Sequence, residues 1–121
     1  MKISKMQQLL EARVLCCEEN VNRHVYSACG CDLMSDVLAF VKDQAVLMPG
    51  LVNSQVIRTA EMMDMVCIVF VRNKQPTEDM LELAREMGIA VLTTPKRMYE
   101  ACGKLYAGGL QKEVTVGGCH E

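Results

Sequence analysis

Tryptophan is absent from the sequence, and aromatic residues make up only 4% of it. A protein with so few aromatic rings offers little surface on which successive nucleic-acid bases could stack. A large excess of charge of either sign is also lacking, because the sequence has 13 Lys and Arg residues and 15 Asp and Glu residues, for a formal net charge of -2. No overall positive field attracts a polyanion. From both absences we expect no nucleic-acid partner.

Long hydrophobic runs are missing as well. No apolar stretch approaches the ~18 residues that a membrane-spanning helix needs. The first residues, MKISKMQQLLEARVL, contain no apolar segment followed by the small-residue cleavage site of a secretory signal. The 7 cysteines are odd in number and irregularly spaced, which favours free thiols over a disulfide framework. Because thiols stay reduced in the cytosol, we expect a cytoplasmic protein with no membrane partner.

What is present is a regular alternation of short apolar segments. The segment 66–71, VCIVFV, is apolar at every position, which is typical of a strand buried on both faces of a parallel sheet. Other segments repeat apolar residues at helical spacing. Strands are expected at 13–17, 24–31, 44–48, 66–71 and 89–94, and helices at 4–12, 32–41, 53–63, 77–87 and 94–107.

This alternation predicts the fold. Strands and helices that follow one another through short connections form parallel strands with right-handed crossovers, so that helices cover both faces of the sheet. We therefore predict an α/β, three-layer fold with a mostly parallel sheet of about five strands. A chain of 121 residues is long enough for one core. We expect a single domain at 1–110, followed by a short strand or flexible tail at 111–121.

Polar residues mark where the helices are expected to begin. Ser4 fits a capping box, because a glutamine follows it three residues later. Asp32, Asn53 and Thr77 are suitable N-caps for the helices that follow them. Thr94 is followed by proline, which is favoured at the first position of a helix.

The residues that follow the predicted strands are the candidate binding residues, since ligands of open parallel sheets bind at the carboxyl ends of the strands. A helix N-terminus at such an end can hold an anion. The predicted ligand is a nucleotide, such as an adenine nucleotide, or another anionic small molecule; solvated strand ends without a ligand are the alternative. The candidate residues are Cys31, Asp32, Gly50, Arg72, Asn73, Thr93 and Thr94, to which Lys74, Lys96 and Arg97 add positive charge.

Motifs of the common enzyme classes are missing from the sequence. It contains no GxxxxGK(S/T) phosphate loop, GxGxxG, HExxH or GxSxG. His24 and His120 are the only histidines, and no spacing pairs either with a cysteine as base and nucleophile. We expect no catalytic residues and no cofactor. A phosphoryl-transfer enzyme ranks last, because it would need a phosphate loop and metal-binding carboxylates.

Two cysteines could form a metal or redox site. Cys29 and Cys31 share one face of a predicted strand, with Cα atoms ~6.6–6.8 Å apart. A structural zinc site needs two further ligands, and no partner motif supplies them. Packing is the favoured interpretation, and a metal- or redox-responsive pair is the alternative. The vicinal residues Cys16 and Cys17 should point to opposite faces of a strand, which is poor geometry for a shared ligand.

Two long segments carry a family resemblance. FVRNKQPTEDMLELAREMGIAVLTT, at 70–94, and MYEACGKLY, at 98–106, are similar to the DRTGG domain family. DLMSDV, which begins at Asp32, resembles the small stand-alone members of that family. The resemblance covers roughly residues 10 to 110. Where the family has its small-residue TGG-like turn, this chain has Val71-Arg72-Asn73, so a larger and charged turn replaces a phosphate-friendly one.

The resemblance implies a function as well as a fold. DRTGG domains are similar to the N-terminal domain of HPr kinase/phosphorylase. They also occur in some phosphotransacetylases and, beside CBS domains, in some inorganic pyrophosphatases. The resemblance therefore implies a regulatory or assembly module without established catalysis. It also implies a homodimer and a metabolic enzyme as protein partner.

Overall fold

The computed structural model of the chain describes residues 1–31 and 44–110. The helix expected from Asp32 and the segment 111–121 lie outside the described residues. Within them, five strands form one sheet in the order β1-β5-β4-β3-β2. The strands are β1 (Arg13–Cys16), β2 (Ser27–Cys31), β3 (Ala45–Pro49), β4 (Cys67–Phe70) and β5 (Ala90–Thr93). The helices are α1 (Ile3–Leu10), α3 (Ser54–Met62), α4 (Glu78–Met87) and α5 (Met98–Ala107), with a short 3-10 helix η1 (Glu18–Asn20).

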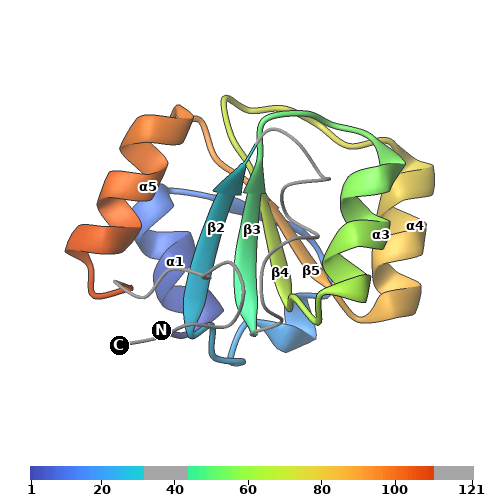
Figure 1. The fold of residues 1–121 in the computed structure, drawn as a ribbon, viewed down its shortest axis with the longest axis horizontal. Coiled ribbons are helices and arrows are strands. Elements are labelled where there is room, and N and C mark those ends of the chain that lie inside the picture. The colour runs from blue at the N-terminus through green and yellow to red at the C-terminus, as the bar shows by residue number, and fades with distance from the viewer. Residues whose placement is uncertain (32–43, 111–121) are drawn as a thin grey trace.

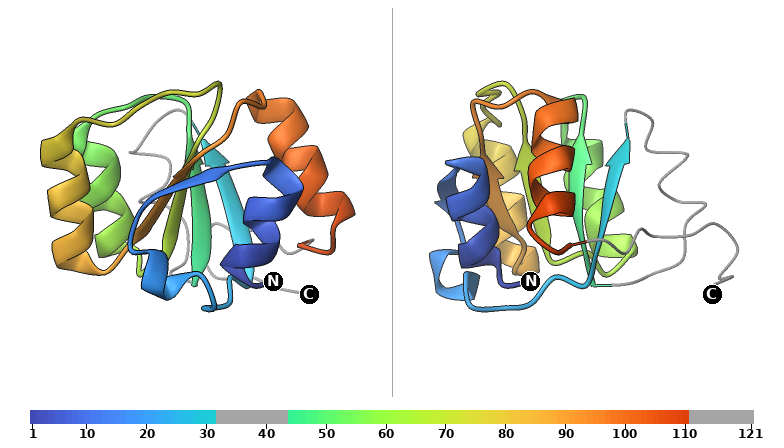
Figure 2. Two further views of the ribbon diagram at one scale, coloured as in Figure 1. Left: turned by 180° about the vertical axis from the view of Figure 1, so that it is seen from behind. Right: turned by 90° about the vertical axis from the view of Figure 1, so that its left-hand side faces the viewer.

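The sheet is mixed but mostly parallel. Strands β2, β3, β4 and β5 pair in parallel, and β1 pairs with β5 in the antiparallel sense. Helices α1 and α5 cover one face of the sheet, and α3 and α4 cover the other (Figures 1 and 2). The predicted three-layer α/β fold is confirmed.

The middle of the sheet shows why the apolar run at 66–71 is continuous. β4 lies between β3 and β5 in the strand order, and helices lie on both sides of the sheet (Figure 2). Every residue of β4 is buried, and Phe70 is fully inaccessible to solvent. Because neither face of β4 is exposed to solvent, neither face carries a polar side chain.

Helices α3 and α4 begin where the sequence predicts. The side chain of Asn53 accepts a hydrogen bond from the backbone N–H of Val56, and that of Thr77 accepts one from Met80. Helix α4 ends at Gly88, whose φ of 70° is left-handed and is favoured by glycine. None of the helices in the described residues is long and apolar enough to cross a membrane.

Two expected helix starts are wrong. Helix α1 begins at Ile3, so that Ser4 lies inside it, and the N–H of Ser4 donates to the carbonyl oxygen of Val21 at 2.8 Å. Helix α5 begins after Arg97 rather than Thr94. At Ser4, a carbonyl group distant in the chain satisfies the backbone N–H that a capping box would have used. The hydroxyl oxygen of Thr94 accepts a local N–H, that of Lys96 at 3.2 Å, but the helix begins only after Arg97.

Candidate functional site

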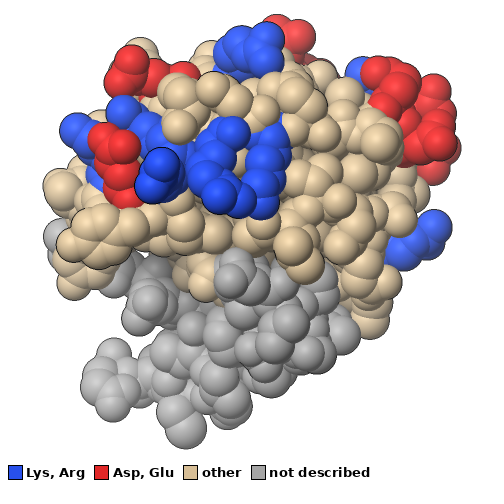
Figure 3. All heavy atoms as spheres, turned by 90° about the horizontal axis from the view of Figure 1, so that it is seen from above, with Lys and Arg blue, Asp and Glu red and all other residues tan. Residues whose placement is uncertain are grey.

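The carboxyl ends of the parallel strands meet at one edge of the sheet. Cys31 at the end of β2 lies opposite Pro49 of β3, and Phe70 of β4 lies opposite Thr93 of β5. The arrowheads in Figure 1 point to this edge, and Figure 3 looks down on it. The strand ends predicted to form a site therefore do lie together. Asp32 lies outside the described residues.

A cleft of about 440 Å³ opens at this edge. Its walls come from three parts of the chain that are far apart in sequence. The end of β3 contributes Gly50 and Leu51, the turn after β4 contributes Val71, Arg72 and Lys74, and the start of α5 contributes Arg97, Met98 and Tyr99.

The charge in the cleft has one sign. Arg72, Lys74 and Arg97 line it, and among the residues that the structure describes no Asp or Glu does. Basic side chains gather on the face seen in Figure 3, although the whole chain carries a formal net charge of -2. Within 1–31 and 44–110, the guanidinium groups of Arg72 and Arg97 make no ion pair, and both residues are exposed. The ammonium group of Lys74 donates a hydrogen bond to the carbonyl oxygen of Gly50.

The turn after β4 has an unusual backbone. Arg72 and Asn73 have φ values of 56° and 57°, in the left-handed region that favours glycine. The N–H of Arg72 donates to the carbonyl oxygen of Lys96, and that of Asn73 to Thr94, both at 2.8 Å. These two N–H groups already have acceptors inside the protein. Charged side chains, and not the backbone of this turn, therefore supply the positive charge of the cleft.

The two threonines predicted to bind a ligand are buried. The hydroxyl of Thr93 donates to the carbonyl oxygen of Lys74 at 2.9 Å, and that of Thr94 donates to the carbonyl oxygen of Leu10. Neither threonine lines the cleft. Both side chains hold the loops that carry the cationic residues.

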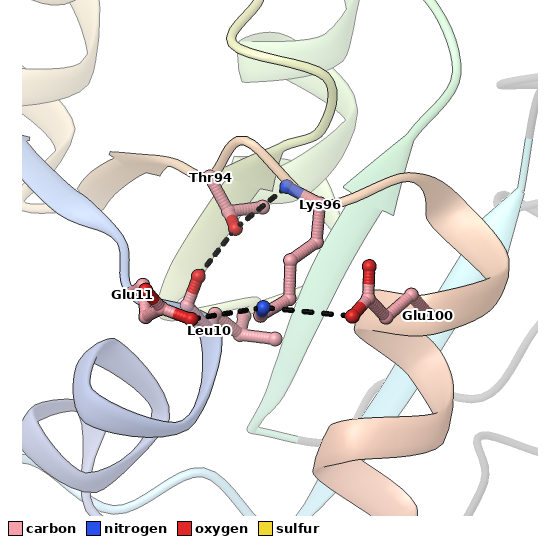
Figure 4. Close-up of polar contacts among 5 residues, drawn as sticks. All are labelled: Leu10, Glu11, Thr94, Lys96 and Glu100. Carbon is pink, nitrogen blue, oxygen red and sulfur yellow. Dashed lines mark hydrogen bonds and ion pairs between the residues drawn. The ribbon is translucent and has the colours of Figure 1, made fainter.

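Lys96 belongs to a different group of charges (Figure 4). Its ammonium nitrogen lies 3.0 Å from Oε2 of Glu11 and 3.6 Å from Oε2 of Glu100. The hydrogen bond with Glu11 raises the pKa of Lys96, and the charge of Glu100 adds to that effect. Lys96 does not line the cleft, so only three of the four expected cations do.

Cys29 is buried in β2, in agreement with the packing interpretation. Among the residues that the structure describes, no group of three or more His, Cys, Asp or Glu side chains could hold a metal ion. Cys17 has a left-handed φ of 59° and leaves the strand. Because β1 ends at Cys16, the alternation of faces expected for two neighbouring strand residues does not apply to Cys17.

Sequence reasoning missed the apolar part of the cleft, which consists of Leu51, Met98 and Tyr99. Leu51 and Tyr99 are 54% and 93% exposed. A signal was present in the sequence, because Tyr99 follows a pair of cations at the start of a helix. The exposure of Tyr99 could not be predicted, because the sequence does not show whether this position of the helix faces the core or the solvent.

The family model of the DRTGG domain matches residues 5–107. The chain belongs to the DRTGG domain family. In this member the turn at Val71-Arg72-Asn73 has left-handed backbone at Arg72 and Asn73, which non-glycine residues seldom adopt. A comparison with curated proteins found no match.

A solved structure shares the fold of this DRTGG domain. It is the crystal structure of the CBS and DRTGG domains of the regulatory region of Clostridium perfringens pyrophosphatase, complexed with the activator diadenosine tetraphosphate. The TM-score is 0.73 at 16% sequence identity, and the match covers 97% of this chain and 51% of that one. The chain therefore spans about half the length of the solved structure that it matches.

Proposed function

We propose that this DRTGG domain is a non-enzymatic regulatory module that binds a phosphate-bearing small ligand, an adenine nucleotide in the first instance, in the cleft at the carboxyl edge of its sheet. The observation that carries the proposal is the set of cleft cations, Arg72, Lys74 and Arg97, which no carboxylate among the described residues of the cleft wall neutralises. Three cations close together attract an anionic ligand.

The shape and position of the cleft support the same ligand class. A volume of about 440 Å³ falls within the usual ~300–1,000 Å³ of small-molecule sites. Helix α5 begins at the cleft, and no side chain caps its first N–H groups. The positive end of the helix dipole therefore adds to the charge of the three cationic side chains.

The residues of the cleft favour binding over catalysis. The described part of its wall contains no His, Cys, Asp or Glu, the side chains that most often act as general base or nucleophile. Phosphoryl transfer also needs a metal ion, which carboxylates usually hold. A ligand that enters this cleft is therefore expected to leave unchanged, as an effector does.

Isothermal titration calorimetry of the reduced protein with ADP and ATP tests the proposal. Arg97→Gln and Arg72→Gln each remove one cation of the cleft. Each is expected to weaken binding about tenfold or more, because a hydrogen bond to a charged group contributes about 1.5–3 kcal/mol. Lys96→Gln is the matched control, since it removes the same charge from the neighbouring residue outside the cleft. No binding at millimolar nucleotide, or equal losses in all three variants, would overturn the proposal.

We also propose that the domain is a cytoplasmic homodimer that acts on a metabolic enzyme as its partner. An exposed aromatic side chain on α5 supports an association surface on that helix, since Tyr106 is 56% exposed. Five cysteines in the described part of the chain, Cys16, Cys17, Cys29, Cys67 and Cys102, form no disulfide, which suits a reducing compartment. Sedimentation velocity at tens of micromolar should give the mass of a dimer, and a monomer at that concentration would contradict this part of the proposal.

A further inference from the structure

Tyr99 is the most exposed of the large apolar side chains in the described part of the chain. It is 93% exposed and lies in the first turn of α5, where it lines the cleft beside Arg97. Tyrosine usually has one apolar face covered by the protein. A ring left this open beside three cations is therefore available to a ligand that the cations attract.

A second apolar side chain lines the cleft. Leu51 follows Gly50 at the end of β3, and it is 54% exposed. The cleft thus combines a cationic part, at Arg72, Lys74 and Arg97, with an apolar part, at Leu51 and Tyr99. A simple phosphate or a sugar phosphate would engage the first part only and would leave the tyrosine ring in water.

From this combination we infer that Tyr99 is a specificity-determining residue: it stacks on the planar base of a nucleotide whose phosphates contact Arg72 and Arg97. This inference rests on the proposed function and adds to it the recognition of the base. Stacking on one tyrosine is compatible with the scarcity of aromatic residues. That scarcity excludes a row of stacked bases but leaves room for one.

Stacking of this kind predicts a specific pattern of affinities. Loss of an aromatic partner weakens binding of a stacked base by roughly fivefold to a hundredfold. A tyrosine ring stacks on any base. Stacking therefore raises the affinity for nucleotides over that for phosphates without a base, but it does not distinguish one base from another.

The test uses calorimetry with two probes, ADP and inorganic pyrophosphate, on the wild-type protein and on three variants. We expect ADP to bind the wild type at least about fivefold more tightly than pyrophosphate. Tyr99→Ala should remove that preference and leave the affinity for pyrophosphate unchanged. Tyr99→Phe should keep the preference, because it keeps the ring. Tyr26→Ala is the matched control, since Tyr26 is 53% exposed and precedes β2 at the other edge of the sheet.

Different results would overturn different claims. If neither probe binds, the proposed function itself fails. If both bind with equal affinity, or if Tyr99→Ala weakens both equally, the cleft binds phosphate but Tyr99 does not recognise a base. If Tyr99→Phe loses the preference as Tyr99→Ala does, the hydroxyl and not the ring makes the contact, and stacking is refuted. Because Tyr99 is exposed, its substitution leaves the core intact, and a thermal melt of each variant checks this.

Discussion

The hydroxyl of Thr94 donates a hydrogen bond to the carbonyl oxygen of Leu10, which lies 84 positions earlier in the chain (Figure 4). The same hydroxyl oxygen accepts the N–H of Lys96 at 3.2 Å. On the other side of this loop, the carbonyl oxygens of Thr94 and Lys96 accept the N–H groups of Asn73 and Arg72. One buried threonine therefore joins the end of α1 to the loop that holds the cationic turn of the cleft.

Replacing Thr94 with valine should destabilise the fold. Thr94→Val keeps the shape of the side chain but leaves the carbonyl oxygen of Leu10 without its donor. Loss of a partner by a buried polar group costs about 1–3 kcal/mol, so the free energy of unfolding should fall by that amount. Urea denaturation followed by circular dichroism measures the change.

Thr94→Ser is the control for this prediction, because it keeps the hydroxyl and removes only a methyl group. It should retain more of the stability than Thr94→Val. If valine proves as stable as the wild type, the contact between Thr94 and Leu10 contributes nothing to folding and the loop is held by other bonds.

Replacing Arg72 with glycine should separate stability from binding. Arg72 has a φ of 56°, which costs a non-glycine residue roughly 1 kcal/mol or more. Arg72→Gly relieves that strain, so the variant should melt at the wild-type temperature or above it. Arg72→Gln keeps the strain and serves as the comparison. Both should lose affinity for ADP, and a clear fall in the melting temperature of the glycine variant would contradict the strain argument.

The order of strands and helices could be predicted from the sequence because each signal was local. The apolar run around β4 and the caps at Asn53 and Thr77 depend on residues that are neighbours in the chain. The starts of α1 and α5 could not be predicted in this way. The N–H of Ser4 donates to the carbonyl oxygen of Val21, and the hydroxyl of Thr94 donates to that of Leu10. No local pattern shows that either group has a partner so far away in the chain.

The site was predictable in position but not in detail. Parallel strands bring their carboxyl ends to one edge, so Gly50 and Arg72 were expected together and both line the cleft. Which cations face the cleft depends on tertiary contacts. Lys96 and Arg97 are adjacent, but Glu11 lies at the end of α1, where it binds Lys96. That ion pair could not be foreseen without the fold.

The capping residue of α3 gives a test of local stability. Asn53→Ala removes the side chain that accepts the N–H of Val56 at 3.2 Å. Loss of an N-cap costs about 0.5–2 kcal/mol, and urea denaturation should show a decrease in that range. Ser54→Ala is the matched control, because Ser54 is the first residue of α3 and is exposed. Equal decreases in the two variants would mean that the cap itself is unimportant.

The buried thiol of Cys16 predicts how stability depends on pH. Burial, with a further contribution from the neighbouring thiol of Cys17, raises the pKa of Cys16 from 9.0 to about 11. The pKa of Cys16 is therefore higher in the folded protein than in the unfolded chain. The stabilisation of the folded state by the neutral thiol is complete below about pH 9 and is lost as pH rises through about 11. In that window the unfolded chain releases a proton that the folded protein keeps.

The free energy of unfolding should therefore fall between pH 9 and pH 11, by up to about 1.4 kcal/mol per pH unit for one thiol. Urea denaturation under reducing conditions at several pH values measures this slope. Cys16→Ala should make it shallower, because it removes one of the buried thiols while Cys67, whose pKa burial also raises, remains. An identical slope in the variant would mean that Cys16 keeps its ordinary pKa in the folded protein, despite its burial and its contact with the carbonyl oxygen of Ile89.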